Sequence, residues 1–258
     1  MNRIDALFSG KRNDILSIFF TAGHPTLNST LEIIEQLQSS GADIVEVGMP
    51  FSDPMADGPT IQQSSKVALE NGMTIDLLFS QLKALRERVY IPVVLMGYFN
   101  PVVKYGVENF LKRCNECGVD GVIIPDMPLD IFEAQYATSF AEYGVYNILL
   151  ATPSANPARI ELLAKRSQGF LYMVSSGATT GGDIKTKPID QLAAAAAVAG
   201  KSSPVLVGFG ISNRNDFMAA AQYGRGAVVG SAFVKMLGQS KNLTIDIKTF
   251  VKSIVGAV

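Results

Sequence analysis

Residues 45–60 hold three acidic side chains in one short stretch, which reads Val-Glu-Val-Gly-Met-Pro-Phe-Ser-Asp-Pro-Met-Ala-Asp-Gly-Pro-Thr. Glu46 lies inside an apolar run typical of a buried strand, and Asp53 and Asp57 follow in a loop rich in proline and glycine. An unpaired carboxylate in an apolar interior is costly or acquires a raised pKa. We therefore expect Glu46, half-buried at the strand end, to be suited to general acid–base catalysis.

The same residues also allow a purely structural interpretation. Glu46 could form a salt bridge at the end of its strand. Asp53 and Asp57 could make Asx-turns beside Pro54 and Gly58. The local sequence favours neither interpretation over the other.

The stretch resembles the signature of the tryptophan synthase alpha chain family, and it agrees with that signature at every position. The resemblance continues in residues 98–101, 208–211 and 230–232, which read Tyr-Phe-Asn-Pro, Gly-Phe-Gly-Ile and Gly-Ser-Ala. Members of this family are barrel lyases that act in tryptophan biosynthesis. The resemblance therefore implies a fold, an activity and a set of site residues for this chain.

The implied reaction is the cleavage of indole-3-glycerol phosphate to indole and glyceraldehyde 3-phosphate, a retro-aldol step without metal or organic cofactor. The carbon–carbon bond breaks after indole C3 is protonated and as the neighbouring glycerol hydroxyl loses its proton. The resemblance implies that Glu46 donates the proton to C3 and then accepts the hydroxyl proton. Asp57 is expected to stabilise positive charge at the indole N–H.

The other expected site residues form an apolar slot and a phosphate site. By resemblance the slot for the indole ring would consist of Phe19, Tyr98, Tyr172 and Phe209, although aromatic residues at strand ends often belong to a core. The phosphate contacts implied by the family match fall on Gly181, Gly210, Gly230 and Ser231. Small residues after two successive late strands also favour a phosphate site by themselves, because backbone N–H groups at a helix N-terminus bind dianions.

Residues 175–187 form a polar, glycine-rich segment of the length expected for a lid over a ligand. Ser176 stands where the family pattern has an arginine, and one glycine has moved. Thr180 and Gly181 are retained, so we expect phosphate capture to be intact. The change leaves open how the lid closes and how a partner controls it.

The elements that must position these residues alternate along the chain. Apolar runs typical of buried strands lie at residues 15–21, 42–47, 92–96, 118–124, 144–150, 169–174, 204–208 and 224–230. Helical patterns lie at residues 2–12, 27–40, 61–70, 75–89, 129–143, 156–167, 189–200, 213–223, 231–237 and 242–258. Several runs begin at a glycine that can end the preceding helix.

This alternation predicts a single-domain (β/α)8 TIM barrel with an extra N-terminal helix, because parallel strands buried on both faces read as short apolar runs. We expect residues 1–258 to form one domain, since no linker divides the chain. An open, doubly wound sheet is the alternative, disfavoured because no G-x-G-x-x-G opens the chain. Active sites of such barrels lie at the carboxyl ends of the strands, where Glu46, Asp57, Tyr98, Asp126 and Tyr172 fall.

Composition and charge argue against several other classes. The chain has 258 residues, of which 48% are hydrophobic, and a formal net charge of −1. A large core is therefore available, and no basic cluster predicts binding to nucleic acid. The first residues carry Arg3 and Asp5 and have no long apolar run, so we expect no signal peptide, no membrane anchor and a cytoplasmic protein.

Cys114 and Cys117 form a C-x-x-C at the end of a predicted helix, just before Gly118. Reactive cysteines lie at helix N-termini, and the sequence has no second pair to complete a metal site. We therefore expect reduced structural thiols and no metal. His24, the only histidine, is expected in a loop near the barrel mouth.

The resemblance also implies a partner, the pyridoxal-phosphate-dependent tryptophan synthase beta chain, in an alpha2beta2 heterotetramer. Two other functions stay open: a sugar-phosphate isomerase barrel with the same late phosphate site, and a catalytically silent regulatory subunit. The intact signature around Asp57 argues against the first. The presence of both Glu46 and Asp57 argues against the second.

Overall fold

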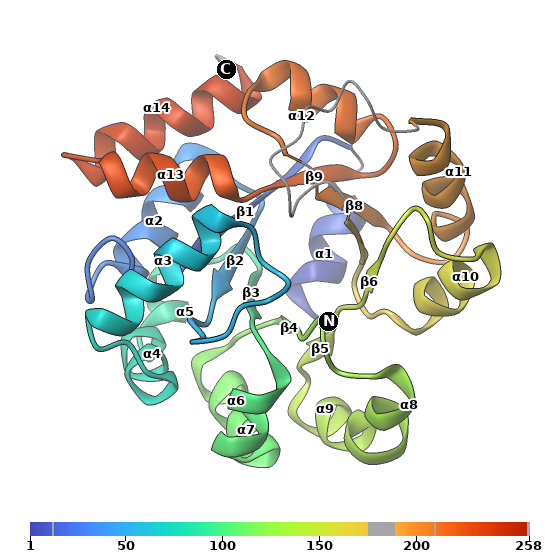
Figure 1. The fold of residues 1–258 in the computed structure, drawn as a ribbon, viewed down its shortest axis with the longest axis horizontal. Helices are drawn as coiled ribbons and strands as arrows, with labels where there is room; N and C mark the ends of the chain where they lie inside the picture. Colours follow the sequence, from blue (N-terminus) through green and yellow to red (C-terminus); the bar gives the residue numbers. More distant parts are fainter. Residues whose placement is uncertain (12, 175–188, 209, 257–258) are drawn as a thin grey trace.

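The strands lie at the centre of the molecule and the helices surround them (Figure 1). The computed structural model describes residues 1–11, 13–174, 189–208 and 210–256. Its strands are β1 (Ile15–Thr21), β2 (Ile44–Gly48), β3 (Val93–Met96), β4 (Gly121–Ile123), β5 (Tyr146–Asn147), β6 (Leu150–Ala151), β7 (Leu171–Val174), β8 (Val205–Gly208) and β9 (Gly226–Val229).

All nine strand pieces belong to one sheet with the order β5-β4-β3-β2-β1-β9-β8-β7-β6, and every pair is parallel. β5 and β6 are two parts of one chain segment, which pairs with β4 at its start and with β7 at its end. Ile148 donates its N–H to Val122 O at 2.9 Å, and Tyr172 donates its N–H to Leu149 O at 3.0 Å. The segment thus closes the ring, and the predicted (β/α)8 barrel is confirmed.

The helices are α1 (Arg3–Gly10), α2 (Thr30–Ser40), α3 (Pro59–Glu70), α4 (Ile75–Leu82), α5 (Leu85–Arg88), α6 (Phe99–Tyr105), α7 (Val107–Cys117), α8 (Leu129–Ile131), the π-helix η1 (Phe132–Tyr136), α9 (Ala137–Tyr143), α10 (Pro157–Arg166), α11 (Ile189–Ala199), α12 (Arg214–Ala221), α13 (Ser231–Gln239) and α14 (Leu243–Val255). Within the described residues, no helix has both the length and the apolar character needed to span a membrane.

Three helical segments differ from the sequence-based prediction. Residues 75–89 form two helices, α4 and α5, because Ala84 between them leaves the helical conformation, with φ −93° and ψ 12°; Arg86 of α5 bonds Gly118 O and Asp120. Residues 129–143 contain the π turn η1 between α8 and α9. The short helix α6 was not predicted; its Pro101 lies in the first turn, where the missing N–H is tolerated.

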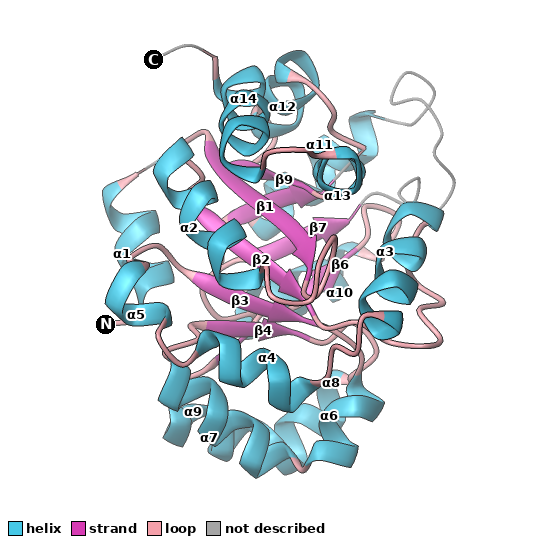
Figure 2. Cartoon of the chain, turned by 90° about the vertical axis from the view of Figure 1, so that its left-hand side faces the viewer, coloured by secondary structure: helices cyan, strands magenta, loops and turns pink. Residues whose placement is uncertain are grey.

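The barrel interior is an apolar cluster separate from the layer between strands and helices. Because side chains alternate along a strand, every second residue points inward. The inner cluster contains Ile15, Ile44, Val94, Ile123, Ile148, Phe170, Leu206 and Val228. Ile4 and Phe8 of α1 belong to the same cluster, and Figure 2 shows α1 at the end where the strands begin. The extra N-terminal helix therefore covers the amino-terminal end of the barrel.

An ion-pair network attaches α1 to this end. Asp120, which is buried, accepts hydrogen bonds from Arg3 at 3.0 Å and from Arg86 at 2.5 Å. Asn2, the N-cap of α1, also donates its side-chain amide to Asp120 O. Removing one partner of a buried ion pair leaves an uncompensated charge. The network therefore fixes the position of α1 under the barrel.

The two cysteines lie where the sequence predicted them. Both are buried free thiols in the last turn of α7, and Gly118 ends that helix with φ 74°. Burial raises the pKa of each thiol. His24 is more buried than its predicted place in a loop suggested, at 8% exposure, and burial lowers its pKa.

Candidate active site

Glu46 lies on the inner face of β2, between β1 and β3. Its side chain has no exposed surface, so the expectation of a half-buried carboxylate was wrong: the residue points into the closed barrel, not past its rim. The Ser17 hydroxyl donates a hydrogen bond to Glu46 Oε1 at 2.6 Å. Glu46 Oε2 has no hydrogen-bond partner among the described residues. Burial raises the pKa of Glu46 to about 7, and the bond from Ser17 opposes this in part.

Asp57 lies in the loop between β2 and α3, and a tyrosine from the next strand holds it. Tyr98, at the N-cap of α6, donates its hydroxyl to Asp57 Oδ2 at 3.0 Å and accepts the N–H of Ala56 at 3.0 Å. Burial raises the pKa of Asp57, and the bond from Tyr98 opposes this. Asp53, in contrast, is exposed and accepts a bond from the neighbouring Ser52. The loop therefore presents Asp57 as its one half-buried carboxylate.

Phe19 and Tyr172 approach Glu46 from two different strands, β1 and β7. Phe19 of β1 is the register partner of Glu46. A Cβ atom on Gly48 would lie 2.6 Å from the Phe19 ring, so the glycine leaves room for that ring above β2. Tyr172 comes from β7, and burial together with the charge of Glu46 raises its pKa. Both rings thus stand within the region of the carboxylate that the sequence predicted to be an indole slot.

The late strands end at a helix N-terminus. Gly230 caps α13, and Ser231, its first residue, is exposed. The first N–H groups of any helix have no partner within it, and they attract anions. A Cβ atom on Gly230 would lie 3.7 Å from Phe19, so this helix N-terminus adjoins the aromatic slot. Gly210 is exposed after β8, whereas Gly181 and Phe209 lie outside the described residues.

A family model described as "Tryptophan synthase alpha chain" matches residues 6–255. The alpha chain of Flavobacterium psychrophilum is 47% identical over 98% of this chain and 100% of its own length. The alpha chain of Parabacteroides distasonis is 48% identical over 92% of this chain and 93% of its own. The chain belongs to the tryptophan synthase alpha chain family. It is therefore a lyase of tryptophan biosynthesis that cleaves indole-3-glycerol phosphate.

Solved structures of this family have the same fold. A tryptophan synthase structure of Mycobacterium tuberculosis superposes with a TM-score of 0.88 at 29% identity, covering 98% of this chain and 96% of that one. Tryptophan synthase subunit alpha of Legionella pneumophila gives a TM-score of 0.87 at 31% identity, covering 98% and 97%. The family match sets aside the alternative of a sugar-phosphate isomerase.

Sequence reasoning missed two residues that contact the predicted site residues of this tryptophan synthase alpha chain family member. Ser17 was assigned only to a strand, and Gly48 only to the signature. Each carries a signal that could have been used, because a lone hydroxyl or a glycine at an inward position of an apolar strand needs a local reason. Asp126, expected at a strand end, accepts the N–H of Phe99 at 2.8 Å and so caps α6.

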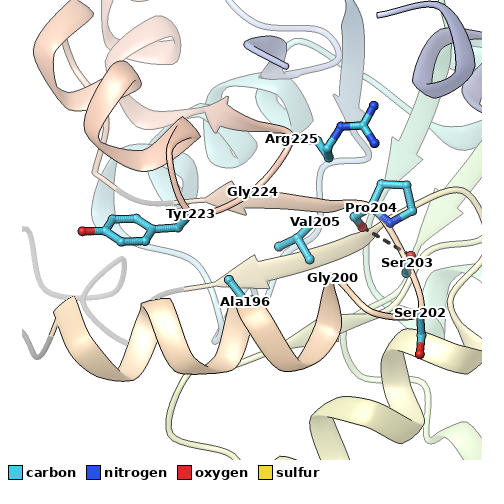
Figure 3. A pocket seen from close by; sticks show the side chains of 9 residues that line it. All are labelled: Ala196, Gly200, Ser202, Ser203, Pro204, Val205, Tyr223, Gly224 and Arg225. Carbon is cyan, nitrogen blue, oxygen red and sulfur yellow. Dashed lines mark hydrogen bonds between the residues drawn. The ribbon is translucent and has the colours of Figure 1, made fainter. Parts of the chain in front are cut away.

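A cavity of about 430 Å³ lies at the other end of the barrel (Figure 3). Its walls include Val205, the first residue of β8, and Gly224 and Arg225, which precede β9. Arg225 donates to Phe8 O at 3.0 Å, so it contributes to the seat of α1. In the part of the chain that the structure describes, no three histidine, cysteine, aspartate or glutamate side chains form a metal-binding group.

Proposed function

We propose that the space bounded by Glu46, Asp57 and the N-terminus of α13 is where this chain cleaves indole-3-glycerol phosphate. The observation that carries the proposal is the state of Glu46, a fully buried carboxyl group with a pKa of about 7, one oxygen of which has no partner among the described residues. Buried titratable groups with shifted pKa values concentrate at functional sites. At neutral pH such a group is available both as an acid and as a base.

In the proposed mechanism Glu46 serves both proton transfers. It first donates its proton to indole C3, which places a positive charge on the ring nitrogen. The resulting carboxylate then takes the proton of the glycerol hydroxyl next to the ring. The oxygen forms a carbonyl, the carbon–carbon bond breaks, and its electron pair returns to the ring. The products are indole and glyceraldehyde 3-phosphate, and Glu46 has recovered its proton.

Asp57 is proposed to stabilise the charge that develops on the indole nitrogen. A carboxylate near that N–H lowers the energy of the cationic intermediate. Tyr98 bonds Oδ2 of Asp57, and the other oxygen, Oδ1, would face the substrate. Because Tyr98 also holds the loop through Ala56 N–H, its proposed contribution is to fix Asp57 as well as to border the ring.

The rest of the substrate is proposed to extend from the aromatic slot toward α13. Phe19 and Tyr172, with Tyr98 and Phe209, would contact the indole ring. Gly230 and Ser231, with Gly210 and Gly181, would hold the phosphate. The adjacency of Phe19 and Gly230 supports this direction, because one ligand can then contact a ring and a helix N-terminus together.

We further propose that a tryptophan synthase beta chain docks on the loops at the carboxyl ends of the strands. Met55, in the loop that carries Asp57, is 90% exposed, and Val103 of α6 is 47% exposed. Tyr98 links these two segments, because it precedes α6 and its hydroxyl accepts the N–H of Ala56. We also propose that residues 1–258 act as one catalytic domain in the cytoplasm, where a phosphorylated substrate is retained.

The test is turnover of indole-3-glycerol phosphate by Glu46→Gln. Since one group is asked to make two proton transfers, we expect a loss above the roughly 10²–10⁴-fold of a single transfer. Substrate titrated into the inactive variant should bind within a few fold of the parent affinity. Asp53→Asn, which changes an exposed carboxylate of the same region, is the matched control and should turn over normally. Ordinary turnover by Glu46→Gln would remove the basis of the mechanism.

A further inference from the structure

Ser17 is the one group of the described residues that hydrogen-bonds the Glu46 side chain. The two residues are 29 positions apart and lie on neighbouring strands, with Oγ and Oε1 at 2.6 Å. Neither side chain has any exposed surface. A bond from a hydroxyl donor to a carboxylate oxygen at this distance belongs to the strong, charge-assisted class.

The neighbours of Ser17 in the sheet are apolar and offer its hydroxyl no side-chain hydrogen-bond partner. In the sheet register its neighbours are Ile44 on β2 and Val228 on β9, which belong to the apolar cluster inside the barrel. A hydroxyl placed in such a layer without a hydrogen-bond partner is unfavourable. An apolar residue would fill this inward position at no such cost, so the serine is explained by the carboxyl group that it contacts.

Because of this bond, the two carboxyl oxygens of Glu46 have different surroundings. Oε1 is held by β1, while Oε2 is buried and has no partner among the described residues. Rotation of the carboxyl group would break the only bond that it makes there. A catalytic group must be held near its productive geometry by its neighbours, and here β1 supplies that constraint.

We propose that Ser17 is a positioning residue for the lyase reaction, which holds Glu46 by Oε1 so that Oε2 exchanges protons with the substrate. This inference rests on the proposed role of Glu46. Ser17 also favours the ionised form of Glu46, since it donates to the charged oxygen, and it thus opposes the effect of burial on the pKa. Among the described residues, Tyr172 of β7 is the titratable group coupled to Glu46: burial raises its pKa, and the charges of Glu46 and Asp57 raise it further.

The experiment compares the pH dependence of kcat and KM for parent, Ser17→Ala, Ser17→Thr and Ser203→Ala. In Ser17→Ala the ionised form of Glu46 loses its hydrogen bond, so its pKa should rise. The limb of the pH–rate profile that reports Glu46 should therefore move to higher pH by about one to two units. Turnover at the optimum should fall by about tenfold while KM changes by less than about threefold. Ser17→Thr retains a hydroxyl and should restore the parent limb. Ser203→Ala removes a buried hydroxyl elsewhere and should match the parent.

A profile of Ser17→Ala that coincides with that of the parent, or a limb that moves downward, overturns the positioning role. A fall in turnover with an unmoved limb also overturns it, because a merely structural serine gives that result. If Ser17→Ala does not fold, Ser17→Cys provides the same measurement with a weaker donor. Glu46→Gln keeps the two proposals separable: its inactivity with an unmoved Ser17→Ala limb refutes only the inference on Ser17, whereas its normal turnover refutes the function of Glu46.

Discussion

A Cβ atom on Gly208 would lie 2.5 Å from the hydroxyl oxygen of Tyr172 and 2.5 Å from its Cε1. Strand β8 therefore has no side chain at the point where the tyrosine of β7 crosses it. Tyr172 can occupy the space beside Glu46 because Gly208 leaves it empty. Gly208 thus makes room for a ring of the predicted indole slot, a role distinct from the phosphate binding that its Gly-Phe-Gly sequence predicts.

Gly208→Ala should displace the Tyr172 ring, since a contact below 3.0 Å requires one group to move and the ring is the more flexible. We expect KM for indole-3-glycerol phosphate to rise by about tenfold with little change in melting temperature. Gly10→Ala, at the end of α1, is the matched control, because a Cβ there meets nothing within 4 Å. Equal kinetics for the two variants would show that the position of the ring does not matter.

Gly230→Val should weaken phosphate binding without unfolding the barrel. A Cβ at this position makes only ordinary contact with Phe19, at 3.7 Å, and the φ of −117° is not in the left-handed region that favours glycine. The added methyl groups would stand at the N-terminus of α13, where the phosphate is proposed to approach the backbone. Calorimetric titration with glycerol 3-phosphate should show at least about a tenfold loss of affinity. Unchanged affinity would place the phosphate elsewhere.

Glu46 should reduce the stability of the protein at neutral and alkaline pH. Its pKa is raised from 4.5 to about 7 in the folded state, so between these values the folded chain keeps a proton that the unfolded chain has released. The free energy of unfolding therefore falls as the pH rises through this window, by about 3 kcal/mol in total. Below the window the full stability is present.

Glu46→Gln does not titrate and should escape this loss. We expect it to exceed the parent by about 2–3 kcal/mol at about pH 8 and to equal it at about pH 4, measured by urea unfolding. Glu70→Gln, at an exposed position of α3, should show no such pH-dependent difference. A gap between Glu46→Gln and the parent that is the same at both pH values would contradict the raised pKa.

A tryptophan synthase beta chain should form a complex with this chain and increase indole formation. A partner that binds an active conformation of this chain more tightly than an inactive one shifts the equilibrium toward the active conformation by that difference in binding free energy. Met55→Asp should weaken the complex, because it places a charge on the proposed docking surface. Ile245→Asp changes an exposed apolar residue of α14 and serves as the control. The complex is detected by its size in solution, and the rate increase by indole formation. If neither is found, the proposed partner is refuted.

The elements of the barrel could be predicted because their signals are local. The run at residues 15–21 has the bounds of β1, and Gly41 and Gly118 end their helices with positive φ. The helix α6 was missed because Phe99-Asn100-Pro101 has the composition of a turn, while its capping residue, Asp126, comes from a later loop. A cap supplied from 27 residues away leaves no local signal.

The site could be predicted as a set of residues but not as a geometry. Glu46 and Asp57 stand in one motif, and their types indicate acid–base chemistry. That Ser17 contacts Glu46 depends on the register of β1 against β2, and that Tyr98 contacts Asp57 depends on how β3 leads into α6. Both contacts join residues far apart in sequence, so a single chain read alone does not define them.

Because α1 fills the amino-terminal end of the barrel, a ligand would reach Glu46 from the side of the carboxyl ends of the strands. Ile4 and Phe8 fill the amino-terminal side, and Arg3 is tied to Asp120 there. A small apolar product formed beside Glu46 would leave past the carboxyl ends of the strands, on the side from which the substrate enters. A beta chain bound at the carboxyl ends of the strands would cover this side, so the released indole would contact the partner before it reaches bulk water.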